Sequence, residues 1–220
     1  MPRRPDPASE LVAAPVGAGL GRAFGAVARV RGRKAIHPRG AVLAATMHRW
    51  GLRPGSGVSW IDSAGDLPVL VRFSRSVGLP PPLPDVFGLS LRFAAPDGAP
   101  ADLLLSSGGR GRLGRHVLAP GRDPRRAAYS TLVPYRGPRG SVLLGARPSP
   151  SGTALLVSLG RGPWREFGRL ELPDAATAAP DQDVDFDAVL HPLPGLQMPR
   201  WLARLRAPAY AASRSGRSRR

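Results

Sequence analysis

The stretch Val69-Leu70-Val71-Arg72-Phe73-Ser74-Arg75-Ser76-Val77-Gly78 decides how this chain is interpreted. Apolar and β-branched residues lead into an arginine and a phenylalanine, and a Ser- and Gly-rich exit follows. Such residues favour extended backbone, so the stretch predicts a β-strand that carries one cation, Arg72. Which function this strand indicates depends on the segments that precede and follow it.

Length and composition indicate one globular domain. The chain has 220 residues, of which 42% are hydrophobic, enough for a sizeable core. Its 27 glycines and 26 prolines indicate many turns and short elements and exclude an all-helical protein. There is no cysteine, which excludes disulfides and thiolate metal sites. We expect a cytoplasmic protein.

The chain is strongly basic, with a formal net charge of +17, and Lys34 is its single lysine. A codon bias toward arginine, alanine, glycine and proline explains this charge, whereas the sharper interpretation is attraction to phosphate. No zinc-finger spacing, helix-turn-helix or aromatic–basic strand signature accompanies it, so we expect no specific nucleic acid. Peripheral contact with an anionic membrane stays open as a partner.

Short apolar runs separated by turn signals predict strands along the middle of the chain. The runs, with a hairpin turn at Pro96-Asp97-Gly98 between the third and the fourth, are 41–47, 69–73, 86–93, 102–106, 141–147, 153–159 and 165–172. Residues 50–66 are expected to be a Gly- and Ser-rich connection. This spacing predicts an α+β protein built on an antiparallel β-barrel or sandwich.

The two ends of the chain predict peripheral helices. We expect an N-terminal arm or helix at 1–30, a single barrel domain at 31–214 and a basic tail at 215–220. The apolar part of the arm suggests a signal peptide superficially, but Pro15, glycines and Arg22 interrupt it. Residues 199–214 carry a helical apolar stripe, and Pro208 is expected to kink or restart the helix.

Two groups of polar residues are expected to be structural. The alternating carboxylates of 181–187 lack the glycine turn and distant glutamate of an EF-hand, so we expect them in solvent. His48, His116 and His191 are widely spaced and have no acidic partner at ligand spacing. We expect them to be structural or exposed.

Several motifs around the central strand occur in a recognisable order. Ile36-His37-Pro38-Arg39-Gly40 precedes it, and Asp102-Leu103-Leu104-Leu105-Ser106-Ser107 and Val133-Pro134-Tyr135-Arg136 follow it. Arg206-Ala207-Pro208-Ala209-Tyr210 closes the series. Together with Val71-Arg72-Phe73-Ser74, this order resembles the haem catalases and their shorter relatives, the catalase-related peroxidases and allene oxide synthases.

The resemblance implies a catalase-like barrel that binds haem b. His37 would be the distal acid–base residue, and Ser106 would stand where the family has its distal asparagine. Tyr210 would ligate the haem iron as a phenolate, favoured by Arg206 one helical turn away. Arg72 would pair with a haem propionate, and Lys34 stands where catalases have a propionate-binding arginine.

Departures from the family pattern limit what it implies. Serine in place of asparagine, Lys34 in place of arginine and Pro208 in place of an aromatic residue weaken the case for efficient peroxide dismutation more than the case for the fold. Each residue also has a plainer role: His37 can cap a turn, Arg72 can extend to the surface, Ser106 can end a core strand, and Tyr210 can pack on an amphipathic tail.

The predicted function is therefore that of a haem-dependent, catalase-like peroxidase acting on hydrogen peroxide or on organic or lipid hydroperoxides. The alternative is a haem-free, degenerate catalase-fold protein that binds a small ligand or hydrolyses phosphoesters. A basic module that binds nucleic acid or a membrane surface is a third class. The sequence leaves the oligomeric state open.

Overall fold

The computed structural model describes residues 40–172 and 184–206, all within one compact unit that spans residues 35–220. Its strands are β1 (Gly40–Trp50), β2 (Ala64–Arg75), β3 (Phe87–Ala94), β4 (Pro100–Ser107), β5 (Tyr129–Ser130), β6 (Tyr135–Gly137), β7 (Gly140–Ser149), β8 (Gly152–Leu159) and β9 (Arg165–Glu171). The helical elements are α2 (Ser59–Asp62), α3 (Gly111–Gly114) and η1 (Pro124–Arg126), and residues 200–206 are also helical.

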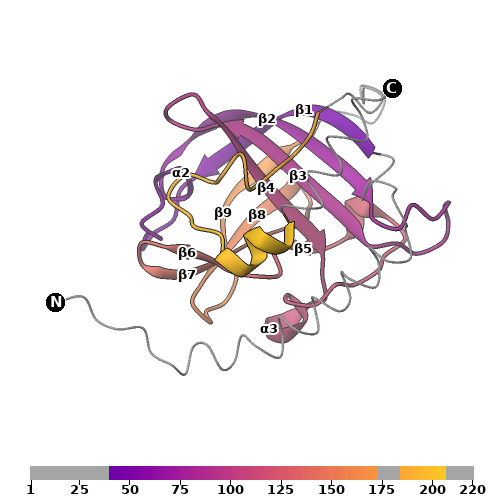
Figure 1. Ribbon diagram of the computed structural model, residues 1–220. Coiled ribbons are helices and arrows are strands. Elements are labelled where there is room, and N and C mark those ends of the chain that lie inside the picture. The colour runs from indigo at the N-terminus through magenta and orange to yellow at the C-terminus, as the bar shows by residue number, and fades with distance from the viewer. Residues whose placement is uncertain (1–39, 173–183, 207–220) are drawn as a thin grey trace. The chain divides into compact units, whose positions relative to one another are not determined.

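The strands form an antiparallel barrel (Figure 1). The sheet order is β5-β4-β3-β2-β1-β9-β8-β7-β6, and the pairing of β5 with β7 closes a ring of eight strands. Of the strands in the described residues, only β6 stands outside the ring, on β7. Closure leaves few unpaired edges, which suits a chain of short strands. The predicted α+β fold with an antiparallel barrel is confirmed.

Alternation along the strands separates the barrel interior from its outer face. Val71, Leu91 and Leu103 are directly opposite one another in β2, β3 and β4, and all three are buried in the hydrophobic core. Successive side chains of a strand point to opposite faces, so the residues between them point outward. This register fixes which predicted site residues share a face.

The connection between β1 and β2 differs from the prediction. We expected residues 50–66 to be an irregular connection, but they contain α2 and the start of β2. The Asp62 carboxylate accepts hydrogen bonds from the Ser56 amide at 2.7 Å and the Gly57 amide at 2.7 Å, which organises the turn. Trp60 then packs against Phe93 with ring centroids 5.1 Å apart.

The other predicted strands are present, usually a few residues longer than expected. The hairpin between β3 and β4 turns at Pro96-Asp97-Gly98 as predicted, and the Gly98 amide donates to the Ala95 carbonyl at 2.8 Å. The expected helix of 199–214 is described over residues 200–206. The expected N-terminal arm lies outside the described residues. No helix among the described residues is long and apolar enough to cross a membrane.

Candidate functional site

The outer face of β2, β3 and β4 contains two predicted site residues. Arg72 pairs with Ser90, which pairs with Leu104; in the adjacent row Ser74 pairs with Gly88, which pairs with Ser106. All six positions alternate with core residues, so they face away from the barrel interior. Arg72 and Ser106 therefore lie on one face, although 34 positions separate them in the sequence. We call these six positions the outer wall.

Toward β3 and β4 the outer wall carries mostly small side chains, namely serines and a glycine beside Leu104. On its other side Arg72 pairs with Val42 of β1, and Leu70 precedes it by two positions on the same face of β2. Arg72 and Ser74 are only 7% and 5% exposed, although they point away from the core. The arginine is thus buried along its whole length, and the interpretation that it reaches to the surface is wrong. A buried guanidinium is stabilised only by polar or anionic groups around it.

The remaining predicted residues divide into two groups. His37, Lys34 and Tyr210 lie outside the described residues. Arg206 ends the described part of the last helix and lies near Tyr135. Burial raises the pKa of Tyr135, and the neighbouring Arg206 opposes that rise. Arg206, the one described residue of the last motif, is therefore a neighbour of the 133–136 motif.

The backbone also joins the 133–136 motif to the segment that leads into the last helix. The Arg136 amide donates to the Gln197 carbonyl at 2.9 Å, and the Gln197 amide donates to the Arg136 carbonyl at 2.8 Å. This reciprocal pair fixes the segment before the last helix against β6. Arg206 is thereby held near the barrel, rather than on a tail free of it.

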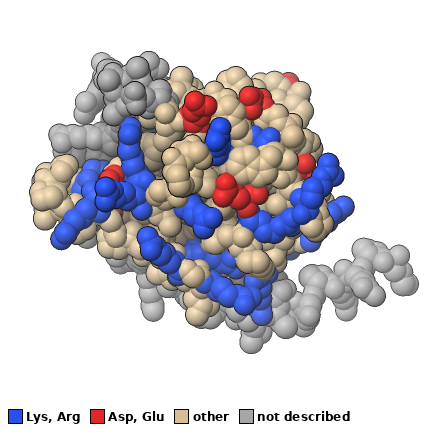
Figure 2. Space-filling view, turned by 180° about the vertical axis from the view of Figure 1, so that it is seen from behind, with Lys and Arg blue, Asp and Glu red and all other residues tan. Residues whose placement is uncertain are grey.

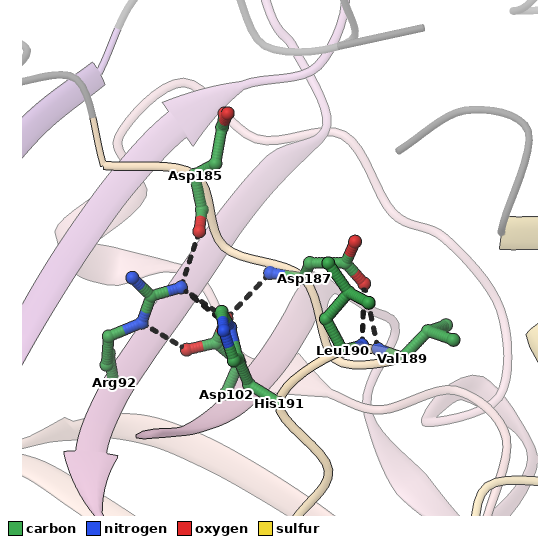
Figure 3. A network of polar contacts seen from close by, with 7 residues as sticks. All are labelled: Arg92, Asp102, Asp185, Asp187, Val189, Leu190 and His191. Carbon is green, nitrogen blue, oxygen red and sulfur yellow. Dashed lines mark hydrogen bonds and ion pairs between the residues drawn. The ribbon is translucent and has the colours of Figure 1, made fainter. Parts of the chain in front are cut away.

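A polar network borders the outer wall (Figure 3). Arg92 of β3 and Asp102 of β4 are directly opposite in register, and Arg92 donates to both Asp102 carboxylate oxygens at 2.7 Å. Asp102 is fully buried and also accepts from the Asp187 amide at 2.6 Å. Nδ1 of His191 lies 3.1 Å from the same carboxylate. The Arg92 guanidinium, the Asp102 carboxylate and the His191 imidazole are thus joined in one network.

This network holds the segment 184–191 on the barrel. The Asp102 amide donates to the His191 carbonyl at 2.9 Å, and Arg92 also contacts the carbonyl of Asp185. Asp187 is 4% exposed, and its carboxylate accepts from the amides of Val189 and Leu190 at 2.9 and 3.1 Å. The expectation that all carboxylates of 181–187 lie in solvent is therefore wrong for Asp187, because it caps a turn.

His48 has acidic partners that sequence spacing did not reveal. Its Nδ1 is 2.8 Å from Asp66 and its Nε2 is 2.7 Å from Glu171. Hydrogen bonds to Glu171 and then Asp66 raise the pKa of His48 above its ordinary value. The register of β1 with β2 and β9 brings the three together, so His48, like His191, has acidic partners that are distant in the sequence.

A shallow depression of about 330 Å³ lies beside the network. It is lined mainly by apolar residues, among them Ala44, Leu70 and Phe93, and Arg92 is its one charged member. This volume is at the low end for small-molecule sites. Among the described residues no group of three His, Asp or Glu side chains is placed to hold a metal ion. The outer wall therefore remains the best candidate site.

Comparison with known proteins supports the fold independently of these motifs. No family profile and no curated protein sequence matches the chain. A solved structure described as that of a bacterial catalase superposes with a TM-score of 0.56 and 12% sequence identity. The match covers 82% of this chain and 56% of that catalase, so the chain spans little more than half of that protein's length. At this identity the likeness shows a catalase-like β-barrel fold.

Proposed function

We propose that this protein binds haem b against the outer wall and acts as a catalase-like peroxidase on hydrogen peroxide or organic hydroperoxides. The observation that carries the proposal is the register of β2, β3 and β4, which puts Arg72 and Ser106 on the same small-chained face. The catalase-like fold supports it, because the three fully described motifs, 71–74, 102–107 and 133–136, belong to a domain with a fold of that kind.

The residues of the outer wall fit such a cofactor in shape and charge. On the sheet itself Gly88 and Ser90 leave no large side chain between Arg72 and Ser106. A planar macrocycle could therefore lie close to these strands, provided that the groups that now bury Arg72 and Ser74 move aside. The guanidinium of Arg72 is a planar, always-charged fork that suits a propionate carboxylate. Lys34, by its place in the sequence, would bind the second carboxylate.

When bound, the haem iron would supply the redox chemistry that splits the oxygen–oxygen bond. Ser106 would orient the peroxide through a hydroxyl that can both donate and accept a hydrogen bond. His37 would move a proton between the two peroxide oxygens. Tyr210 would bind the iron as a phenolate, for which a cation such as Arg206 is a favourable neighbour.

The serine at position 106 favours a peroxidase over a fast catalase. A hydroxymethyl group is shorter than the carboxamide of asparagine and offers one donor hydrogen rather than two. It would therefore hold hydrogen peroxide less firmly while leaving more room on the distal side. We therefore expect the extra space to favour the binding of bulkier organic hydroperoxides.

The test is reconstitution of the purified chain with haem, followed by turnover assays. We expect a Soret band that saturates at one haem per chain, and reduction of cumene hydroperoxide at least as fast as that of hydrogen peroxide. Ser106→Asn should shift the preference toward hydrogen peroxide. A folded chain that develops no Soret band would refute the proposal and leave a haem-free catalase-fold protein.

A further inference from the structure

The connection between β4 and β5 carries the most exposed large apolar side chain among the described residues. Leu113, on α3, is 84% exposed, and Val117, one turn further along, is 56% exposed. A single exposed leucine is common, but one held at the tip of an otherwise polar loop is not explained by the barrel.

The loop is firmly attached to the barrel, so the exposure of Leu113 does not come from a loose segment. The Gly109 amide donates to the Val117 carbonyl at 3.0 Å, which closes the loop at its base. Arg115 is buried and donates to Ser158 Oγ at 2.9 Å, and its guanidinium lies 5.3 Å from the centroid of the Trp164 ring. Arg115 thus anchors the loop while Leu113 points into solvent.

Arginines lie close to the exposed leucine. Arg110 and Arg112 precede it on the loop, and Arg112 donates to the carbonyl of the exposed Arg161 at 2.8 Å. No acidic residue occurs in 108–122 or in the turn 160–164. Figure 2 shows arginine side chains gathered over the lower part of one face, with few carboxylates among them. The tip is therefore both apolar and positively charged.

We propose that this tip docks the protein on an anionic lipid surface, with Leu113 entering the interface and Arg110, Arg112 and Arg161 contacting lipid phosphates. An apolar side chain together with nearby basic residues combines hydrophobic insertion with attraction to anionic lipid. Each arginine near an anionic surface contributes roughly fivefold to the partition coefficient, and burial of the leucine contributes about tenfold. Binding to nucleic acid would involve the arginines, but it would not require an exposed leucine such as Leu113.

The absence of cysteine allows a direct test. The full chain is labelled with the environment-sensitive fluorophore NBD at Leu113→Cys and mixed with phosphatidylcholine vesicles with or without phosphatidylserine. We expect a blue-shifted, brighter emission with phosphatidylserine only, reversed at high salt. Leu83→Cys is the matched control, because Leu83 is also exposed, at 48%, but belongs to a proline-rich loop.

Unlabelled variants measure the same binding by vesicle sedimentation. Leu113→Ser should lower the partition coefficient about tenfold, and Arg110→Gln with Arg112→Gln roughly 25-fold. Arg136→Gln with Arg204→Gln removes the same charge from exposed positions elsewhere and should have a smaller effect. The proposal would be overturned if the two arginine pairs caused equal losses or if Leu113→Ser changed nothing. It would also be overturned if the emission of the label at position 113 changed with single-stranded DNA but not with vesicles.

Discussion

Replacement of Asp102 by asparagine tests the polar network that holds 184–191 on the barrel. The substitution keeps the side-chain shape and removes the negative charge. In the native protein the carboxylate accepts hydrogen bonds from Arg92 at 2.7 Å and from the Asp187 amide at 2.6 Å. An asparagine offers one oxygen, and its amide hydrogens would face the donors of Arg92.

The expected loss follows from the burial of the pair. Asp102 is fully buried, whereas the Arg92 side chain is 21% exposed, so water can offset part of the loss on the arginine side only. Breaking a buried ion pair at one end costs about 3–5 kcal/mol, and partial exposure of Arg92 points to the lower limit, about 3 kcal/mol. For a domain of this size that corresponds to a fall of about 1 M in the urea midpoint.

Urea unfolding followed by circular dichroism measures this loss. Glu166→Gln is the matched control, because its ion pair with Arg147 is exposed and 3.8 Å long, and we expect a change of no more than about 0.5 kcal/mol. Limited proteolysis should also reach 184–191 faster in Asp102→Asn. A loss below about 1 kcal/mol, similar to the control, would show that the network is not a structural latch.

Other predictions concern titration and packing. The pKa of His48, measured by NMR, should lie above its ordinary value and fall more in Glu171→Gln than in Asp66→Asn, the order of their contributions; the opposite order would contradict the geometry. Burial raises the pKa of Tyr129, so its unfolded form ionises first and stability should fall by about 1.4 kcal/mol per pH unit above about pH 10; urea midpoints that are as flat above that pH in the native chain as in Tyr129→Phe would refute this. Gly168→Ala would place a Cβ 2.5 Å from the His48 carbonyl oxygen, and we expect a loss of about 1–3 kcal/mol in thermal or urea unfolding, since the backbone there has no room to yield.

Local patterns were sufficient to predict most of the barrel. Strand residues such as Val69 to Phe73 favour extended backbone on their own, and Pro96-Asp97-Gly98 specifies a hairpin, so these elements need no distant information. The pairing of β5 with β7, which closes the ring, could not be predicted from local sequence patterns. β5 is two residues long, and its pairing depends on a register that only the assembled sheet defines.

Of the contacts in the site, some follow from local sequence patterns and others depend on the assembled fold. The pair Arg92–Asp102 follows from the predicted hairpin, since its register places them opposite each other. His191 joins them from a distance of 89 positions, and Glu171 reaches His48 across 123, so no spacing rule could find either contact. Arg72 was identified by its motif, but its burial was not, because burial depends on what surrounds the outer face.

The most direct test of the proposed haem site compares two arginines. Haem is titrated into the purified native chain, into Arg72→Gln and into Arg49→Gln, and the Soret absorbance gives the dissociation constants. Arg49 is a partly buried arginine on β1 that donates to the Trp60 carbonyl and is remote from the outer wall in register. We predict one haem per chain, at least tenfold weaker binding in Arg72→Gln, as for loss of one charge-assisted hydrogen bond, and native affinity in Arg49→Gln. No Soret band in the native chain, or equal affinities in all three, would contradict the account.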